Sequence, residues 1–453
     1  MVMAFRFLAL SIFVLVGYLT YNMIITKKGA LTFSLENAEQ NTNANGVLFW
    51  DLKHPIKVRI TAKKGIKRYQ LKATTKDNLV IYEKEVLVLD KPKTLEILLP
   101  KPEIQGLEGR HITYEFKAFD WSYAHFFDGN WTKFQCDVRI DTKKPSIKVL
   151  AHSPSITYGG SALVVFEAID ENLFRAFVRI RDREFKAFRL EEYQGHNVFV
   201  ALIPWSYGIK DFKALVVAQD KAYNTSSQPL LFKRKAHRIK EVDYNIQTLE
   251  ENLSHMDLSP KFKQNLKNDF ETTLLKALNQ TRQEDLNIFK QEAMQQGLFY
   301  EDFSVFKALA PVGENTRIMG HFLENRRFLK DNQVLAQALH FGVDLRVKRN
   351  NPLNFKNPVK KVLRKNLGFY GDSALYCYGL GLCVFFSHLK SQTKSPQEFV
   401  GNSGFSFGNY LHMGVFLQGV LVRPNEWLNQ NWINDNIIAP LSLAKSRLLE
   451  NKE

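Results

Sequence analysis

The feature that most constrains the fold is a long stretch, from about Val47 to Arg234, in which apolar and polar residues alternate in short runs. Gly, Pro, Asn and Asp residues interrupt these runs. Alternation with a period of two places every second side chain on the same face of a strand. The stretch therefore predicts antiparallel strands that bury one face and expose the other to solvent.

A weak internal repeat divides this stretch into two copies of one module. Phe116–Asp120 and Val216–Asp220 each end an alternating run with Ala-x-Asp, and they lie one hundred residues apart. This spacing suits immunoglobulin-like β-sandwich domains. The segment Asp141–Pro145 lies between the copies and resembles a junction between bacterial immunoglobulin-like domains. We expect a first immunoglobulin-like domain over residues 29–144 and a second over residues 145–234.

Aromatic residues gather at one point of the first copy, around Trp121, Tyr123 and Trp131. Flat rings stack on the faces of sugars, so these residues are candidates for a sugar-binding platform. Packing within the core and the loops is the alternative that we favour, because large aromatic side chains commonly fill such positions.

The N-terminus carries an apolar run that suits a membrane. Residues 7–25 are nineteen residues without a charge, which is enough for a helix to cross a bilayer. Two lysines follow the run closely, and no small-x-small cleavage site does. We interpret residues 1–28 as a short cytoplasmic stub and a transmembrane anchor; a cleaved signal peptide is the alternative.

Length and charge limit the remaining possibilities. A chain of 453 residues is too long for one hydrophobic core and suggests about three domains. The net charge is +16, but the lysines are scattered through the strand-like segments. A nucleic-acid-binding surface would gather them into one stripe, so no nucleic-acid partner is expected. A solvated basic surface explains most of the charge, and an acidic polymer is a compatible partner.

Cysteine is scarce. Cys136, Cys377 and Cys383 are an odd number, so the sequence predicts no disulfide framework. Cys377 and Cys383 flank five residues that can form a hairpin loop and bring the two sulfur atoms together. We expect free thiols rather than this pairing, and a zinc-binding role for these cysteines is expected even less.

The hydrophobic period changes from two to about four between residues 235 and 299, which predicts a helical linker. Ser259 followed by Pro260 is a favourable helix start. The polar stretch 279–284 is expected to separate this helix from a second one over residues 285–296, which Gly297 ends. Such a helical hairpin either reaches over a neighbouring site or a partner, or is a spacer. The apolar positions are Phe262, Leu266, Phe270, Leu274 and Leu278.

Two segments near the C-terminus offer metal-ligand chemistry. His340 and Asp344 are separated by three residues, and residues 400–409 form a glycine-punctuated loop that leads to a strand with His412. Between them, a Gly-x-Gly turn at 379–381 leads up a strand to His388. Zinc takes about four ligands near 2 Å, including His nitrogens and carboxylate oxygens.

These motifs, in this order, resemble the LytM/lysostaphin-type zinc metallopeptidases, which cut peptidoglycan. The resemblance covers about residues 312–422 and implies a β-rich peptidase domain, which we place at 300–453. It implies that His340, Asp344 and His412 bind Zn²⁺ and that His388 is catalytic. Tyr410 stands where the family has a second catalytic His, two residues before His412 and therefore on the same strand face. Tyr378 also replaces a usual His and is expected to alter the groove rim.

Chain geometry adds one requirement to this resemblance. In an extended strand His340 and Asp344 would lie roughly 13 Å apart, which is too far for one ion. The chain must therefore curl between them, and Gly342 permits this because glycine adopts backbone angles that other residues avoid.

The sequence thus predicts a mainly β protein, anchored once in the inner membrane with its bulk in the periplasm, that hydrolyses peptide bonds in peptidoglycan.

A tyrosine hydroxyl can donate a hydrogen bond to an oxyanion, but a phenol with a pKa near 10 is a poor general base. His388 would then move the proton. The first alternative is a regulator that binds the wall and acts on other peptidoglycan hydrolases. Other wall hydrolases and envelope proteins are candidate partners. The second alternative is an adhesion protein whose last domain is structural.

Overall fold

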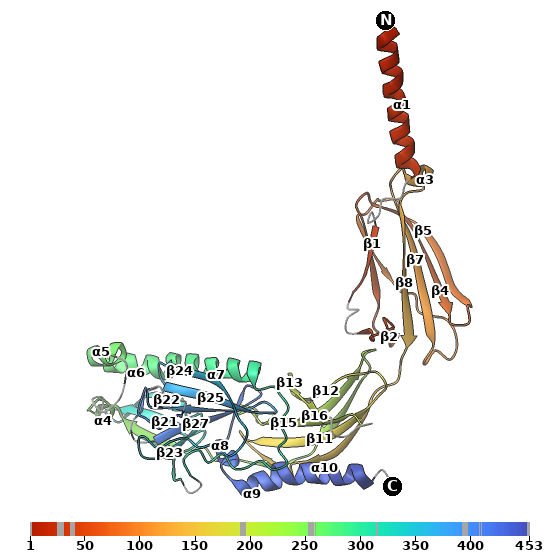
Figure 1. Cartoon of the computed structure of the whole chain (residues 1–453). Helices are drawn as coiled ribbons and strands as arrows, with labels where there is room; N and C mark the ends of the chain where they lie inside the picture. Colours follow the sequence, from red (N-terminus) through yellow and green to blue (C-terminus); the bar gives the residue numbers. More distant parts are fainter. Residues whose placement is uncertain are drawn as a thin grey trace. The chain divides into compact units, whose positions relative to one another are not determined.

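The structure is a computed structural model of the chain. For its described residues the predicted mainly β class is confirmed, with several separate sheets (Figure 1). The chain divides into two compact units, 1–145 with 170–175 and 218–226, and 146–169 with 176–217 and 227–453. The predicted domain boundaries remain predictions. The described residues are 2–24, 31–36, 41–190, 196–251, 258, 260–313, 316–391, 397–406, 408 and 410–450.

The described residues of the first unit contain helices α1 and α3 (Ala124–Phe127) and two sheets. Helix α1 (Val2–Ile24) precedes a three-stranded sheet of order β1-β3-β6 and a five-stranded sheet of order β2-β8-β7-β4-β5. Alternate residues of both sheets share one core, which includes Val58, Tyr114 and Val138. This is the buried face that the alternation predicted. The strands are β1 (Leu31–Leu35), β2 (Leu48–Trp50), β3 (Lys57–Ala62), β4 (Ile66–Thr75), β5 (Val80–Leu87), β6 (Thr94–Leu98), β7 (His111–Asp120) and β8 (Trp131–Ile140).

Within the described residues, no helix is both long enough and apolar enough to cross a membrane. The side chains of α1 are described from Leu10 to Tyr21, and its large apolar residues there are exposed.

The second alternating segment forms two four-stranded sheets. Their strand orders are β14-β15-β11-β9 and β13-β12-β16-β17, and a parallel pair β10-β18 completes the segment. The strands are β9 (Ser146–His152), β10 (Ser155–Thr157), β11 (Ser161–Ile169), β12 (Leu173–Ile180), β13 (Arg183–Lys186), β14 (Phe188–Arg189), β15 (Val198–Pro204), β16 (Ala214–Asp220), β17 (Thr225–Leu230) and β18 (Lys233–Lys235).

The predicted helical hairpin is wrong. After α4 (Ile246–Glu251) and α5 (Pro260–Asn268), the run of α6 (Phe270–Lys276), the π-helical turn η2 (Ala277–Thr281) and α7 (Arg282–Gln296) is continuous (Figure 1). The break lies earlier, where Asp269 caps α6 by accepting a hydrogen bond from the Thr272 N–H. The polar residues 279–284 continue the helix because Gln, Arg and Glu are good helix formers. The predicted cap Ser259 lies outside the described residues.

The C-terminal part is built on a seven-stranded sheet with the order β20-β23-β27-β26-β25-β24, with β28 paired to β27. A separate three-stranded sheet, β19-β21-β22, adjoins it in sequence. The strands are β19 (Glu241–Asn245), β20 (Ile318–Gly320), β21 (Asn325–Lys330), β22 (Gln333–Leu339), β23 (Val343–Arg346), β24 (Lys360–Leu367), β25 (Gly371–Gly379), β26 (Leu382–Ser387), β27 (Tyr410–Leu417) and β28 (Val420–Val422).

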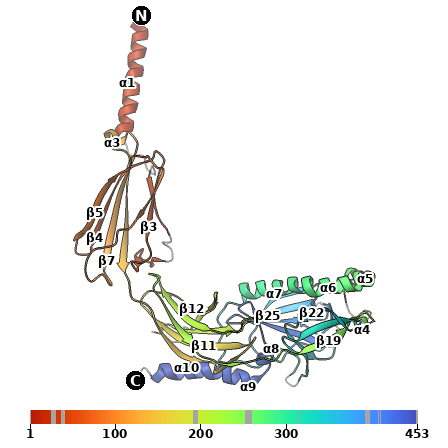
Figure 2. The same cartoon turned by 180° about the vertical axis from the view of Figure 1, so that it is seen from behind.

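Helices cover two sides of the second unit. The α6–α7 run contacts β24, β25 and β26, and α10 (Ala439–Glu450) contacts β9 and β11 (Figure 2). Short helices α8 (Pro424–Trp427) and α9 (Gln430–Ile433) and the π-helical turn η3 (Asn434–Ile438) lead into α10. Trp427 is fully buried in the core that these helices share with the seven-stranded sheet.

The expectation of free thiols at Cys377 and Cys383 is wrong, because the two residues form a disulfide. They face each other directly in the antiparallel β25–β26 pair, on either side of the Gly379–Gly381 turn. Cross-strand register therefore brings the sulfur atoms together. Cys136 is free and buried. Tyr378, expected at the groove rim, is also buried, and its ring packs against Phe306.

Candidate metal centre

Two neighbouring strands carry two of the predicted ligands. Asp344 on β23 and His412 on β27 are directly opposite each other in the antiparallel register. Residues paired in this way on adjacent strands have side chains on the same face. The Oδ1 atom of Asp344 lies 2.9 Å from Nδ1 of His412. Strand pairing thus brings a carboxylate and an imidazole together across 68 residues of sequence.

His340 lies in the connection between two sheets, and its side chain lies beside Asp344 and His412. It follows β22 of the three-stranded sheet and precedes β23 of the seven-stranded sheet. Its Nδ1 lies 2.9 Å from the carbonyl oxygen of His321, which can only accept a hydrogen bond. Nδ1 therefore carries the hydrogen, and the lone pair of the ring is on Nε2. The predicted curl between His340 and Asp344 is present as the change from one sheet to the other.

Three donor atoms converge here at a spacing that fits zinc. His340 Nε2 lies 3.1 Å from His412 Nδ1 and 3.3 Å from Asp344 Oδ1. Ligands held about 2.0–2.1 Å from one tetrahedral ion are separated by roughly 3.3 Å. All three side chains are buried. Among the described residues they form a His₂Asp group that could hold a metal ion.

Gly342 is needed for space rather than for its backbone angles. Its φ lies outside the left-handed region, which corrects the reason expected from the sequence. A Cβ at this position would lie 2.5 Å from Cε1 and 2.6 Å from Nε2 of His412. Any larger residue would therefore displace the imidazole that faces Asp344.

Arg326 on β21 balances the charge of the site. Its Nη2 donates to Oδ2 of Asp344 over 2.6 Å and leaves Oδ1 for the two histidines. Gly320 makes room for this pair, since a Cβ there would lie 2.4 Å from Oδ2 and 2.5 Å from Nη2. The guanidinium charge opposes that of the Asp344 carboxylate, and the buried Glu324 carboxylate also lies 3.7 Å from Nη2 of Arg326. Sequence reasoning missed Arg326, because it follows no motif and belongs to another sheet.

Burial and charge set the protonation of the site. Burial lowers the pKa of His412 to about 4, although the neighbouring Asp344 opposes this shift. Burial likewise lowers the pKa of His388 to about 4, and the adjacent His412 adds to the effect. Burial would raise the pKa of Asp344, but His340 and Arg326 outweigh it and hold that pKa well below its usual range. At neutral pH the imidazoles are neutral and the carboxylate is charged, as metal binding requires.

His388 follows β26 and stands beside the three ligands. Its ring centre lies 6.1 Å from that of His412 and 5.4 Å from that of Tyr410. Its Nδ1 donates to the carbonyl oxygen of Ser403 over 2.8 Å, so its Nε2 keeps a lone pair. Tyr410 and His412 both line the same small cavity, as strand alternation predicted. The structure thus brings all five predicted site residues together; their roles remain predictions.

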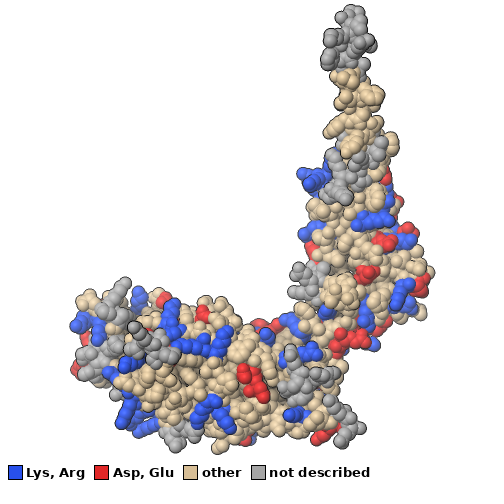
Figure 3. All heavy atoms as spheres, viewed as in Figure 1, with Lys and Arg blue, Asp and Glu red and all other residues tan. Residues whose placement is uncertain are grey.

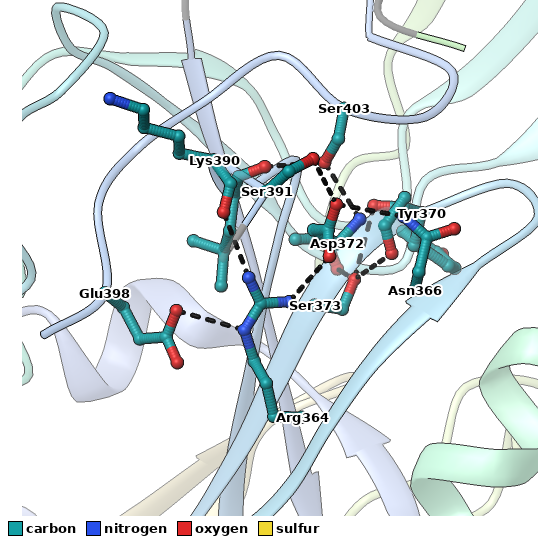
Figure 4. Close-up of polar contacts among 12 residues, drawn as sticks. Arg364, Asn366, Tyr370, Asp372, Ser373, Lys390, Ser391, Glu398 and Ser403 are labelled. Atoms are coloured by element: carbon teal, nitrogen blue, oxygen red, sulfur yellow. Dashed lines mark hydrogen bonds and ion pairs between the residues drawn. The ribbon is translucent and has the colours of Figure 1, made fainter. Parts of the chain in front are cut away.

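A polar network behind His388 fixes the loop that carries Ser403 (Figure 4). Arg364 pairs with Asp372 over 3.0 Å and with Glu398 over 3.1 Å. The N–H of Asp372 donates to Oγ of Ser403 over 2.8 Å, and that Oγ donates to the carbonyl oxygen of Leu389 over 2.6 Å. Ser403 lies within the glycine-punctuated loop, which was the one sequence signal for this network.

The site is closed. The cavity around it has a volume of about 30 Å³, whereas a single water needs about 10–15 Å³ on the same measure. Tyr244 of β19, Leu278 of η2 and Arg282 of α7 line it together with the site residues. Arg282 also donates to the carbonyl oxygen of Leu339 over 2.6 Å. The α6–α7 run therefore reaches over the site, the first of the two alternatives for this segment. In this conformation no peptide has room beside the donor atoms.

A larger hollow of about 680 Å³ lies along α10 and residues 300–305. None of the five predicted site residues faces it.

The first unit contains a second group of potential ligands. Carboxylate oxygens of Asp141, Asp170 and Asp220 lie within 4.8 Å of one another. Asp220 accepts hydrogen bonds from N–H and Nδ2 of Asn224, both over 2.8 Å. Asn172 donates to Asp141 and, through its N–H, to Asp170. Burial raises the pKa of Asp220 to about 7, and Asp141 adds to this effect.

The comparisons with known proteins are weak. No family model and no curated protein sequence matches the chain. A Pseudomonas aeruginosa structure named as a candidate peptidase M23 is 15% identical with a TM-score of 0.35, over 62% of this chain and 96% of that chain. A structure of a zinc containing peptidase from Vibrio cholerae is 8% identical with a TM-score of 0.23, over 69% of this chain and 80% of that chain.

Proposed function

We propose that the C-terminal part of the chain is a zinc-dependent peptidase domain that hydrolyses peptide bonds in peptidoglycan stems or cross-bridges. The observation that carries this proposal is the convergence of His340 Nε2, Asp344 Oδ1 and His412 Nδ1 within 3.3 Å of one another. Three protein ligands leave a fourth position for water or substrate, which is typical of catalytic zinc sites.

Zinc held by these residues would polarise the scissile carbonyl and lower the pKa of a bound water. The chain's own residues supply the proton transfer and the hydrogen bonds. His388 is unprotonated at neutral pH because its pKa is lowered to about 4, and its Nε2 lone pair can accept a proton. Ser403 keeps the ring in that tautomer. The Tyr410 hydroxyl can donate to the oxygen on which negative charge develops.

Substrate and location are part of the same proposal. The net charge of +16 is complementary to a wall polymer whose peptides carry free carboxylates. The Cys377–Cys383 disulfide favours an oxidising compartment such as the periplasm. The uncharged run over residues 7–25 supports a single inner-membrane anchor.

The closed cavity supports a second candidate, a domain that binds the wall and regulates other hydrolases without cutting. About 30 Å³ beside the donor atoms admits no peptide, and Tyr410 is a weaker proton acceptor than a histidine. The enzyme is the better supported of the two, because a domain without catalysis has no chemical need for a three-ligand site with an open position.

One paired experiment separates the two candidates. We would measure the zinc content of the full chain and the release of muropeptides from purified sacculi, for wild type, His412→Ala and His388→Ala. The enzyme predicts release that either substitution abolishes, with zinc lost only in His412→Ala. Zinc without release, even after Leu278→Ala and Arg282→Ala loosen the cover, would favour the regulator. His196→Ala is the control for removal of a histidine, since this residue pairs with Glu167 away from the site.

Tyr410 gives a graded test of the same proposal. Tyr410→Phe removes a donor to the developing oxyanion and should slow release by about 10²-fold. Tyr410→His supplies a second imidazole and should increase release by a factor of up to about 10². Equal rates for all three proteins would show that residue 410 has no part in the reaction.

A further inference from the structure

We propose that one end of the first unit binds the surface of a phospholipid bilayer that contains anionic lipid. This end, which we call the aromatic end, consists of residues 63–65, 87–93 and 121–130. The proposal concerns a separate part of the molecule and does not depend on the metal centre or on the reaction.

The strand registers place these three segments at the same end of the sandwich. Leu31 at the start of β1 pairs with Ala62 at the end of β3. At the next connections, Ile66 pairs with Asp120, and Arg68 pairs with Leu87. The start of β1 therefore lies at the aromatic end, and six residues separate it from the end of α1. Six residues span about 20 Å at most, so the apolar N-terminal helix joins the unit at this end.

Large apolar side chains at this end are exposed. Leu87 is 67% exposed, Leu89 77%, Tyr123 65%, Phe126 72% and Phe127 56%. Burying apolar area of this size is favourable, so soluble surfaces rarely gather it at one place unless it is covered. Aromatic rings with this exposure suit the boundary between lipid headgroups and acyl chains, where aromatic side chains are enriched.

The loop that carries the aromatic residues is held in a strained conformation. His125, Phe126 and Phe127 have φ values of 52°, 52° and 73°, in the left-handed region that costs about 1–2 kcal/mol per residue. Such strain persists only where the surroundings enforce it. Lys67 Nζ donates to the carbonyl oxygen of Phe127 over 2.7 Å, and Arg68 pairs with Asp128 over 2.8 Å. The two phenylalanines are thus presented outward by a fixed loop.

Basic side chains surround this apolar group. Lys63, Lys64, Lys91 and Lys93 are exposed on the adjoining loops, and Figure 3 shows Lys and Arg side chains on this part of the first unit. Basic residues beside an apolar segment are attracted to anionic headgroups. Exposed apolar side chains with basic side chains around them favour a lipid surface over a protein partner or a sugar polymer.

Trp121 argues against the sugar platform considered from the sequence. Lys91 Nζ lies 4.7 Å and Lys67 Nζ 5.7 Å from the centre of its ring. These two cation–π contacts engage the ring with neighbouring parts of the same unit. Trp121 therefore belongs to loop packing, the alternative that we favoured.

The test uses the full chain, reconstituted into vesicles of phosphatidylcholine and phosphatidylglycerol. Tyr123→Cys carries an environment-sensitive nitrobenzoxadiazole label and leaves both phenylalanines in place; the buried Cys136 is shielded from labelling. We expect a blue shift of the label and quenching by lipids spin-labelled near the headgroup. Replacement of Phe126 and Phe127 by serine should abolish both signals, and vesicles without phosphatidylglycerol should weaken them.

The matched control lies at the opposite end of the unit. Leu79 and Val80 are also exposed, at 57% and 43%, so Leu79→Ser with Val80→Ser removes apolar area without touching the aromatic end. This control variant should keep the signals of wild type. The proposal is overturned if the label at position 123 is insensitive to vesicles, if both double variants lose the signal equally, or if purified sacculi shift it where vesicles do not.

Discussion

Each of two clusters among the described residues places three potential metal ligands within 4.8 Å of one another. The two clusters differ in how they accommodate closely spaced ionisable groups. The His340, Asp344 and His412 cluster combines one carboxylate with two imidazoles and pairs the carboxylate with Arg326. The Asp141, Asp170 and Asp220 cluster consists of carboxylates alone, with asparagine N–H groups as neighbours.

The pKa values of the two clusters shift in opposite directions. In the mixed cluster burial lowers the pKa of His412 to about 4, so the ring is neutral and its lone pair is free at pH 7. In the carboxylate cluster burial raises the pKa of Asp220 to about 7, so a proton relieves the repulsion. Proximity alone therefore does not define a metal site; neutral donors and a compensating charge distinguish the first cluster from the second.

The largest expected effect contrasts the two clusters directly. His412→Ala removes one of three ligands and should lower zinc affinity by more than about 100-fold, since even outer-sphere changes cost 10–100-fold. Asp220→Ala should leave the zinc content unchanged. Zinc analysis of both purified proteins after dialysis checks this, and a loss of zinc from Asp220→Ala would contradict the assignment of the metal to the mixed cluster.

The next prediction concerns the charge balance of the mixed cluster. Arg326→Gln leaves Asp344 buried without its partner, which should lower the free energy of unfolding of the metal-free protein by about 3–5 kcal/mol. With zinc present the loss should be smaller, because the cation also faces the carboxylate. Urea unfolding with and without a chelator measures both values.

Arg327→Gln on the same strand is the control for Arg326→Gln. Arg327 pairs with Asp243 near the surface, over 2.7 Å, where solvent screening leaves an ion pair with little effect on stability. If Arg326→Gln were no more harmful than this control, Arg326 would not be the counter-charge that we infer.

A smaller effect is expected from Gly342→Ala. The added Cβ would lie 2.5 Å from Cε1 of His412 and should push the ring away from Asp344, lowering zinc affinity by about 10–100-fold. Gly408→Ala is the matched control, because its Cβ would meet the Tyr410 ring at 3.8 Å, an ordinary contact. Zinc titration compares the two, and equal affinities would show that the site tolerates this displacement.

The most gradual effect is a pH dependence from the carboxylate cluster, because it is spread over several pH units. The folded-state pKa of Asp220, about 7, is above its ordinary value of 3.8, so the folded protein binds this proton more tightly. Its contribution to stability is present below about pH 4 and is lost as pH rises to 7, by at most about 1.4 kcal/mol per pH unit.

Asp220→Asn cannot titrate and should remove this slope, whatever its effect on absolute stability. Urea unfolding of both proteins at pH values from 5 to 8 measures the difference in slope. Parallel curves for wild type and Asp220→Asn would show that Asp220 is ionised throughout that range.

Local patterns predicted much of the fold. The alternation between residues 47 and 234 corresponds to the strands of several sheets, because a period of two is a property of the strand itself. The predicted antiparallel pairing is wrong for two pairs, β2–β8 and β10–β18, which are parallel. The period of about four near residues 260–278 corresponds to helix. The break within the helical segment was misplaced, because Asp269 caps a new helix and the Gln, Arg and Glu residues among 279–284 are good helix formers.

The sequence predicted which residues form the site, but not the contacts that hold them in place. His340, Asp344, His388, Tyr410 and His412 were recognisable because their spacing lies within short motifs. The Cys377–Cys383 disulfide depended on strand register, which decided a pairing that cysteine count alone disfavoured. Arg326 and Ser403 act on the site residues across sheet and loop contacts that no local pattern records.

By itself the sequence determined which segments form strands and helices and which side chains can offer electron pairs to a metal. Only the tertiary structure decided that Arg326 neutralises Asp344, that Gly342 makes space for His412, and that Leu278 and Arg282 close the cavity. The physical reason is range: periodicity and motifs reflect interactions between near neighbours in the chain, whereas charge balance, steric fit and access depend on residues that only folding brings together.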